Sequence, residues 1–136
     1  MRNKAIMSYS YQDYLQSKDY LQARLSGFMP EVLLVLGSGL GFVGDMVENP
    51  INIPYDQIPN FCRATAPGHS GQLIFGTLAG KNVCVMQGRF HYYEGYDFEQ
   101  VTFPIRLIGM LGATKMLITN AAGGLAEGLS PGSIWL

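Results

Sequence analysis

The chain has 136 residues and a formal net charge of −1, from nine Lys and Arg against ten Asp and Glu. Apolar residues make up 48% and charged residues 14%, a balance that is typical of one folded domain and excludes a disordered tail. There is no basic excess to bind a nucleic-acid backbone, and the basic residues are too scattered for a membrane-binding patch. The longest aliphatic run, residues 32–36, is far shorter than the roughly 20 residues of a transmembrane helix. Residues 1–11 also lack the apolar segment of a secretory signal, so we expect a cytoplasmic protein.

The two cysteines, Cys62 and Cys84, are too few for a disulfide framework. We expect both to be reduced thiols, with Cys84 buried inside the apolar run VCVM. Two histidines and two cysteines, without the spacing of known metal ligands, predict no metal site.

The first half of the chain predicts a helix, a strand and a loop. A helix is expected over residues 9–25, where Ser10 and Asp13 form a capping box and apolar residues recur at near-helical spacing. Residues 32–36 predict a strand buried on both faces, followed by the glycine-rich turn GSGLGFVG and a short helical piece. Residues 49–69 contain four prolines, which predict an ordered loop with short extended pieces.

The second half alternates strands and helices. Residues 72–78 and 82–87 predict paired strands around a tight turn, and residues 97–111 predict a helix that Asp97 caps and Pro104 kinks. Residues 115–119 predict another buried strand, and the final residues SIWL predict the start of one more.

The order of elements predicts an α/β fold with a mixed, largely parallel sheet flanked by helices. A parallel sheet needs helices on both faces, and only two substantial helices are expected. We therefore expect residues 1–136 to form a single domain that is the amino-terminal part of a larger, here apparently incomplete, fold.

The 17 glycines make up 12.5% of the 136 residues, against about 7% in an average protein, and they gather at a few turns. Ligands of α/β sheets bind at the carboxyl ends of strands, and three candidate segments follow predicted strands: residues 37–41, 88–95 and 120–124. We expect these three turns to converge.

The turn at residues 37–41, GSGLG, fits an anion site in which glycine amides and the Ser38 hydroxyl donate hydrogen bonds; the alternative is a plain strand-to-helix turn. No Lys is present to make it a P-loop. Residues 39–44 match the dinucleotide pattern G-x-G-x-x-G, but the match lies too far into the turn, and the expected acidic residue would be Asp56 in the proline-rich segment. A nicotinamide-dinucleotide module is thus a weak alternative.

Residues 88–95, GRFHYYEG, hold the densest set of candidate site residues. Arg89 suits an oxyanion, and in an extended segment His91 and Tyr93 share its face, whereas Glu94 points elsewhere unless Gly95 bends the loop. The alternative is a surface loop in which Arg89 and Glu94 form a salt bridge.

The sequence leaves the roles of two further residues, His69 and Asn120, undecided. His69, between two glycines, belongs either to a loop beside a ligand or to an exposed turn. Asn120, in NAAGG, begins either a ligand platform of small residues or an ordinary turn. No G-x-S-x-G motif supports serine hydrolysis.

Five motifs occur in a family-specific order: LGSGLG, PGHSGQLIFG, GRFHYYEGY, VTFPIR and TNAAGG. From about residue 9 to residue 136 the chain resembles the amino-terminal half of the trimeric, low-molecular-mass purine nucleoside phosphorylases. The resemblance implies a pentosyl transfer: inorganic phosphate attacks the anomeric carbon of a purine nucleoside, which releases the base and ribose 1-phosphate. It also implies a homotrimer, purine salvage, and no cofactor besides phosphate as co-substrate.

The resemblance further implies roles for individual residues. His91 and Glu94 are implied to be catalytic, Tyr93 to contact ribose, and Asn120 to support the site from the strand end. The residues implied to bind phosphate are Ser38, His69, Arg89, His91 and, through its backbone, Ala121.

The family's base-binding Glu and Asn, its second phosphate-binding serine and its ribose-supporting methionine lie in the carboxyl half, which this sequence does not contain. We therefore expect the 136-residue chain by itself to be inactive. Two alternatives remain at this stage. One is a catalytically inactive phosphate-binding fragment, and the other is a 5′-methylthioadenosine phosphorylase.

Overall fold

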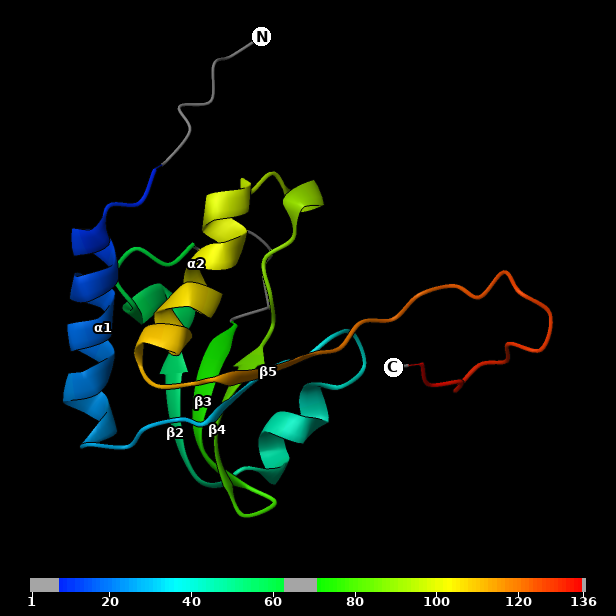
Figure 1. Cartoon of the computed structure of the whole chain (residues 1–136), viewed down its shortest axis with the longest axis horizontal. Helices are drawn as coiled ribbons and strands as arrows, with labels where there is room; N and C mark the ends of the chain where they lie inside the picture. The colour runs from blue at the N-terminus through cyan, green and yellow to red at the C-terminus, as the bar shows by residue number, and fades with distance from the viewer. Residues whose placement is uncertain (1–7, 63–70, 136) are drawn as a thin grey trace, which may run out of the picture.

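The computed structural model describes residues 8–62 and 71–135. Its centre is a five-stranded sheet of order β2-β3-β4-β1-β5 (Figure 1). β1 runs parallel to β4 and β5, whereas β3 is antiparallel to β2 and β4, which confirms the expected mixed sheet. The strands are β1 (Val32–Val35), β2 (Glu48–Pro54), β3 (Gln72–Leu78), β4 (Lys81–Gln87) and β5 (Lys115–Ile118).

Two helices, α1 (Tyr11–Leu25) and α2 (Phe98–Met110), cover one face of the sheet (Figure 1). Both expected capping boxes are present, Ser10 with Asp13 and Asp97 with Gln100, and Pro104 lies inside α2. The larger part of the core lies between these helices and the sheet. It includes Leu21, Leu25, Leu33, Phe75, Cys84, Met86, Phe103 and Leu107.

The opposite face carries a smaller cluster under the short 3-10 helix η1 (Gly41–Met46). This cluster contains Leu36, Val47, Ile74, Val83 and Val85. In β1 the exposure alternates, with Leu33 and Val35 buried and Val32 and Leu34 only half-buried. The expectation that β1 is equally buried on both faces is therefore only partly right.

The proline-rich segment contains a strand that the sequence did not predict. Residues 48–54 form β2, which pairs with β3 at the edge of the sheet. Pro50 is tolerated because an edge strand bonds on one side only, and the pairing register shifts between Glu48 and Ile51. The expected ordered loop with short extended pieces is thus only partly right, because its first extended piece is a full strand of the sheet and, of the described residues of the segment, only 55–62 form no strand.

The expected burial of the strand at residues 115–119 is also wrong. All four residues of β5 are exposed, and Met116, Leu117 and Ile118 each keep about half of their surface accessible. β5 lies at the other edge of the sheet with β1 as its neighbour, and the rest of the described chain leads away from it (Figure 1).

The expected strand at the end of the chain is absent from the described residues. Residues 133–135 form no strand, and Ile134 and Trp135 are exposed. Leu136 lies outside the described residues. None of the helices described is long and apolar enough to cross a membrane.

Candidate functional site

The three glycine-bearing turns meet at one edge of the sheet. β4, β1 and β5 are parallel neighbours in this order, so their carboxyl ends point to the same edge. Thr119, which directly follows β5, contacts both of the other turns. Its Oγ1 accepts a hydrogen bond from the Gly37 amide at 2.8 Å, and its carbonyl oxygen accepts one from Arg89 Nη1 at 3.0 Å. The predicted convergence is confirmed.

The turn after β1 packs directly on the turn after β5. A Cβ atom at Gly37 would lie 2.7 Å from the carbonyl oxygen of Thr119 and 2.9 Å from Cα of Asn120. The turn is closed by the Leu40 amide, which donates to the carbonyl of Gly37 at 3.2 Å, and Gly39 has a positive φ of 85°. Within the described part of the chain, the amides of Ser38 and Gly39 have no hydrogen-bond acceptor. Both residues are exposed, so these two donors are available to an anion.

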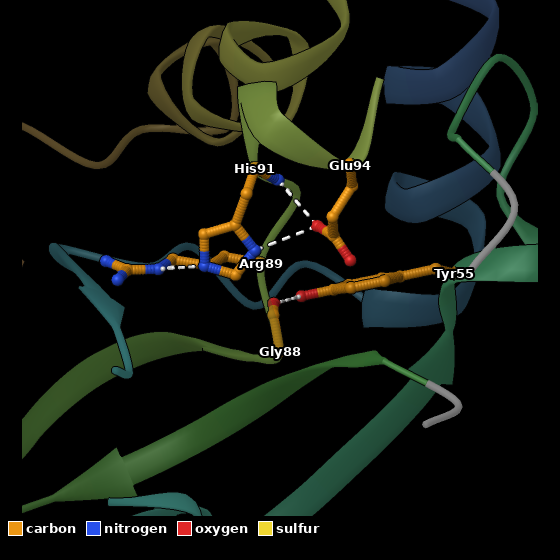
Figure 2. A network of polar contacts seen from close by, with 5 residues as sticks. All are labelled: Tyr55, Gly88, Arg89, His91 and Glu94. Atoms are coloured by element: carbon orange, nitrogen blue, oxygen red, sulfur yellow. Dashed lines mark hydrogen bonds and ion pairs between the residues drawn. The ribbon is translucent and has the colours of Figure 1, made fainter. Parts of the chain in front are cut away.

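The turn after β4 holds a chain of polar contacts (Figure 2). Arg89 Nε donates to His91 Nε2 at 3.0 Å, and Glu94 Oε2 lies 2.8 Å from both the amide nitrogen and Nδ1 of His91. Because an arginine nitrogen can only donate, the partners assign the ring proton to Nδ1, where it faces Glu94. In this arrangement the imidazole is neutral and its Nε2 accepts from the guanidinium.

The alternative of a salt bridge between Arg89 and Glu94 is wrong, because the carboxylate pairs with His91 instead. The backbone bends at the 3-10 turn η3 (Tyr92–Glu94), which ends at Gly95 with a φ of 95°. The Tyr93 ring stacks on the His91 ring with centroids 4.7 Å apart. Arg89, His91 and Tyr93 therefore contact one another in sequence, although a 3-10 turn, and not the expected extended segment, brings Tyr93 onto His91.

Among the described residues, no carboxylate pairs with the guanidinium of Arg89. Its known partners are one carbonyl oxygen and one imidazole nitrogen, neither of which carries a negative charge. The positive charge of Arg89 is therefore available to bind an anion, at the same edge of the sheet as the free amides of the turn after β1.

Tyr55 supports the turn after β4 through a hydrogen bond to its backbone. Its hydroxyl donates to the carbonyl of Gly88 at 2.5 Å, directly before Arg89 (Figure 2). The ring is 3% exposed and packs against Phe61 and Phe90, and burial raises the pKa of the phenol well above its usual range. The hydroxyl therefore stays protonated and keeps the Gly88 carbonyl in place.

Three residues with positioning contacts at the site were not predicted. Tyr55 lies in the segment expected to be a loop, and Thr119 was expected only as the end of a strand. Gln87, at the end of β4, accepts from Gln72 at 2.7 Å and donates to the carbonyl of Gly41 at 2.8 Å. Thr119 begins the motif TNAAGG, but no local pattern shows the role of any of these residues, because their partners are distant in the sequence.

The remaining expected site residues are Asn120, Ala121 and His69. Asn120 and Ala121 are exposed in the turn that follows Thr119. His69 lies outside the described residues. In residues 8–62 and 71–135, no three His, Cys, Asp or Glu side chains lie close enough together to hold a metal ion.

Comparison with known proteins decides the family. Residues 31–136 match the family model of the phosphorylase superfamily. The chain belongs to the phosphorylase superfamily. Among curated members, it is 53% identical over 107 residues to purine nucleoside phosphorylase 1 of Geobacillus stearothermophilus, which covers 79% of this chain and 39% of that protein. It is 43% identical over 128 residues to the purine nucleoside phosphorylase of Bos taurus, which covers 94% of this chain and 44% of that protein.

Solved structures of this superfamily confirm the nucleoside phosphorylase-like fold. A purine nucleoside phosphorylase in complex with ribose-1-phosphate has a TM-score of 0.85 and 45% identity, over 91% of this chain and 45% of that one. The Schistosoma mansoni enzyme in complex with inosine has a TM-score of 0.83 and 43% identity, over 91% and 43% of the two chains. The chain thus spans about two-fifths of the length of the phosphorylases that it matches.

Proposed function

We propose that the protein carrying this chain catalyses the reversible phosphorolysis of purine nucleosides, and that the edge formed by the three turns binds the attacking phosphate. One observation carries the proposal: the guanidinium of Arg89, with no carboxylate partner in the described residues, lies at the same edge as the free amides of Ser38 and Gly39. The relatives named purine nucleoside phosphorylase, and the related structure with ribose-1-phosphate, support this substrate class.

In the proposed site, phosphate is bound by charge-assisted and neutral hydrogen bonds. Arg89 supplies the positive charge. Only its Nε and Nη1 are engaged, so its remaining N–H groups can donate to phosphate. The Ser38 hydroxyl, the backbone of Ala121 and His69 add contacts. His91 joins the phosphate-binding set when its Nε2 is released from Arg89 and carries a proton, because both ring nitrogens are otherwise engaged. Such fixed donors orient the nucleophile and cost little reorganisation during the reaction.

The chemistry proposed for this site is electrostatic. As the N-glycosidic bond breaks, positive charge develops on the ribose, and a phosphate dianion held beside it stabilises that charge while it attacks the anomeric carbon. Glu94 fixes the orientation and tautomer of His91 through its contacts with the His91 amide and Nδ1. These two residues are the proposed catalytic pair.

The proposed ribose contact is Tyr93. Its ring is 82% exposed and stacks on His91, so one face of the phenol is held in place while the edge remains open to a sugar. Asn120 supports the site from its backbone position against Gly37.

The wider proposal follows the family resemblance. Residues 1–136 form a single domain, the amino-terminal part of a larger phosphorylase, which works as a homotrimer without metal or cofactor. A cytoplasmic location is supported by the two cysteines, which are both free.

Two measurements test this function. Titration calorimetry with inorganic phosphate on the 136-residue chain should show binding, and phosphorolysis of inosine should be assayed on the same sample after its intact mass is verified. Binding with turnover supports the full activity; binding without turnover supports a phosphate-binding part that needs further chain for catalysis. No phosphate binding would defeat the proposal. A parallel assay with 5′-methylthioadenosine separates purine nucleosides from the 5′-thio substrates of the alternative enzyme.

A further inference from the structure

We infer that Thr119 is the positioning residue that holds the amide turn and the guanidinium of the anion site in one geometry. This inference rests on the proposed function and assigns a role to a residue that has no substrate contact of its own. Thr119 contacts both sides of the site at once, because the turn after β1 meets its hydroxyl and the turn after β4 meets its carbonyl oxygen.

The hydroxyl of Thr119 has a defined partner in each direction. It accepts from the Gly37 amide at 2.8 Å and lies 3.2 Å from the carbonyl oxygen of Val35, to which it donates. The Thr119 amide donates to the same carbonyl at 3.0 Å. The side chain therefore extends the pairing of β1 and β5 by one residue beyond the end of the strands.

This contact holds the turn that carries the free amides. With the Gly37 amide bonded to Thr119 and the Gly37 carbonyl bonded to the Leu40 amide, both ends of the turn are held. The amides between them, those of Ser38 and Gly39, have no hydrogen-bond acceptor in the described residues. Without the hydroxyl, the Gly37 amide would lose its acceptor and the turn would lose one of its two anchors.

The carbonyl of Thr119 positions the other part of the anion site, the guanidinium of Arg89. It accepts from Arg89 Nη1 at 3.0 Å, so the position of the charge depends on the same residue. The turn after β1 lies close to the same oxygen, since a Cβ at Gly37 would be 2.7 Å from it. A shift of the backbone at residue 119 would therefore move the guanidinium and the amides together.

Threonine suits this role for two chemical reasons. Its hydroxyl both accepts and donates, which the contacts with Gly37 and Val35 require. Its branched Cβ restricts χ1, so the oxygen is held in place more firmly than in serine. Thr119→Val keeps the shape and removes the hydroxyl, and Thr119→Ser keeps the hydroxyl.

The test measures phosphate binding by titration calorimetry on the 136-residue chain. Thr119→Val should raise the phosphate Kd about tenfold, and Thr119→Ser should keep it within about twofold of the parent. Hydrogen exchange of the Gly37 amide should be faster in Thr119→Val only. The matched control is Thr102→Val, which removes a hydroxyl that donates to the Phe98 carbonyl at 2.8 Å on α2, away from the site. Its phosphate Kd should not change.

The outcomes separate this inference from the proposed function. A folded Thr119→Val chain with the parent's phosphate affinity overturns the inference and leaves the function standing. A parent chain that binds no phosphate defeats the function and the inference with it. If Thr119→Val does not fold, Thr119→Ala provides the same comparison, and loss of the fold in both variants would overturn the positioning role in favour of a purely structural one. Equal weakening by Thr102→Val would overturn it as well.

Discussion

The guanidinium of Arg89 reaches across the end of β1 to the carbonyl oxygen of Thr119, with 3.0 Å between Nη1 and the oxygen. Because β1 lies between β4 and β5, this bond joins residues that follow two non-adjacent strands. It places an arginine side chain, which combines positive charge with a fork of donors, beside the glycine turn after β1. The geometry of the proposed phosphate site depends on this contact.

Replacing Arg89 should affect phosphate binding above all. Arg89→Ala removes a charged, multiply bonded donor, and charge-assisted bonds contribute about 1.5–3 kcal/mol each. Two such bonds to phosphate correspond to a loss of affinity of about a hundredfold or more, measured as the phosphate Kd by calorimetry. Arg89→Lys keeps the charge but not the fork, and should recover only part of the affinity. An unchanged Kd in Arg89→Ala would place the guanidinium outside the site.

Tyr55→Phe should destabilise the fold through a single hydroxyl. The variant removes the hydrogen bond from the buried Tyr55 hydroxyl to the carbonyl of Gly88, a residue that is itself exposed, and the loss of such a bond costs about 0.5–1.5 kcal/mol of unfolding free energy. Urea unfolding monitored by circular dichroism measures the loss. Tyr11→Phe is the matched control, because that ring is 67% exposed and its variant should stay within about 0.5 kcal/mol of the parent. Equal stability of the two variants would contradict a supporting role for the Tyr55 hydroxyl.

Gly37→Ala should be strongly destabilising because there is no room for a methyl group. The new carbon would meet backbone atoms of Thr119 and Asn120 at 2.7 to 3.0 Å, and backbone cannot move aside as a flexible side chain can. We expect a lower melting temperature and weaker phosphate binding. Gly109→Ala is the comparison: that glycine lies in α2 with no heavy atom within 4 Å of the added carbon, so the substitution should stabilise the chain by about 0.5–1 kcal/mol. A Gly37→Ala chain as stable as the parent would show that the two turns are not in contact.

Stability should fall in alkaline solution because of the buried thiol of Cys84. Burial raises the pKa of this thiol, so the folded chain keeps the proton above about pH 8.5, where the unfolded chain loses it. Ionisation therefore favours the unfolded state, and the free energy of unfolding should decrease by up to about 1.4 kcal/mol per pH unit for this group.

Urea unfolding of the parent and of Cys84→Ala at several pH values from 7.5 to 9.5 tests this expectation. The variant should be less stable at pH 7.5 but should show a shallower decline with pH, because one of the groups that titrates only after unfolding has been removed. Cys62, whose pKa is also raised by burial, accounts for part of the remaining slope. Parallel curves for the two proteins would exclude Cys84 as a source of the decline.

Local patterns were sufficient for the helices and for the hairpin. Ser10 with Asp13 and Asp97 with Gln100 mark the starts of α1 and α2, because a capping box needs only residues three positions apart. The hairpin of β3 and β4 was likewise expected, and its tight turn lies at residues 79 and 80, which both have positive φ. The proline-rich segment was predicted only in part: short extended pieces were expected, but not that one of them pairs with β3, because whether proline is allowed in a strand depends on whether that strand lies at an edge.

The sequence alone predicts which residues form the proposed site, namely the glycine turn with Ser38 and the motif from Arg89 to Glu94, and the order of its motifs points to the family. It could not specify which turns meet, because the neighbours of β1 are established by pairings between distant parts of the chain. Only the folded sheet brings the Thr119 hydroxyl to Gly37, turns Glu94 toward His91 and places the Tyr55 hydroxyl under Gly88. Hydrogen bonds act over about 3 Å, so their partners are decided by proximity in space and leave no periodic pattern in the chain.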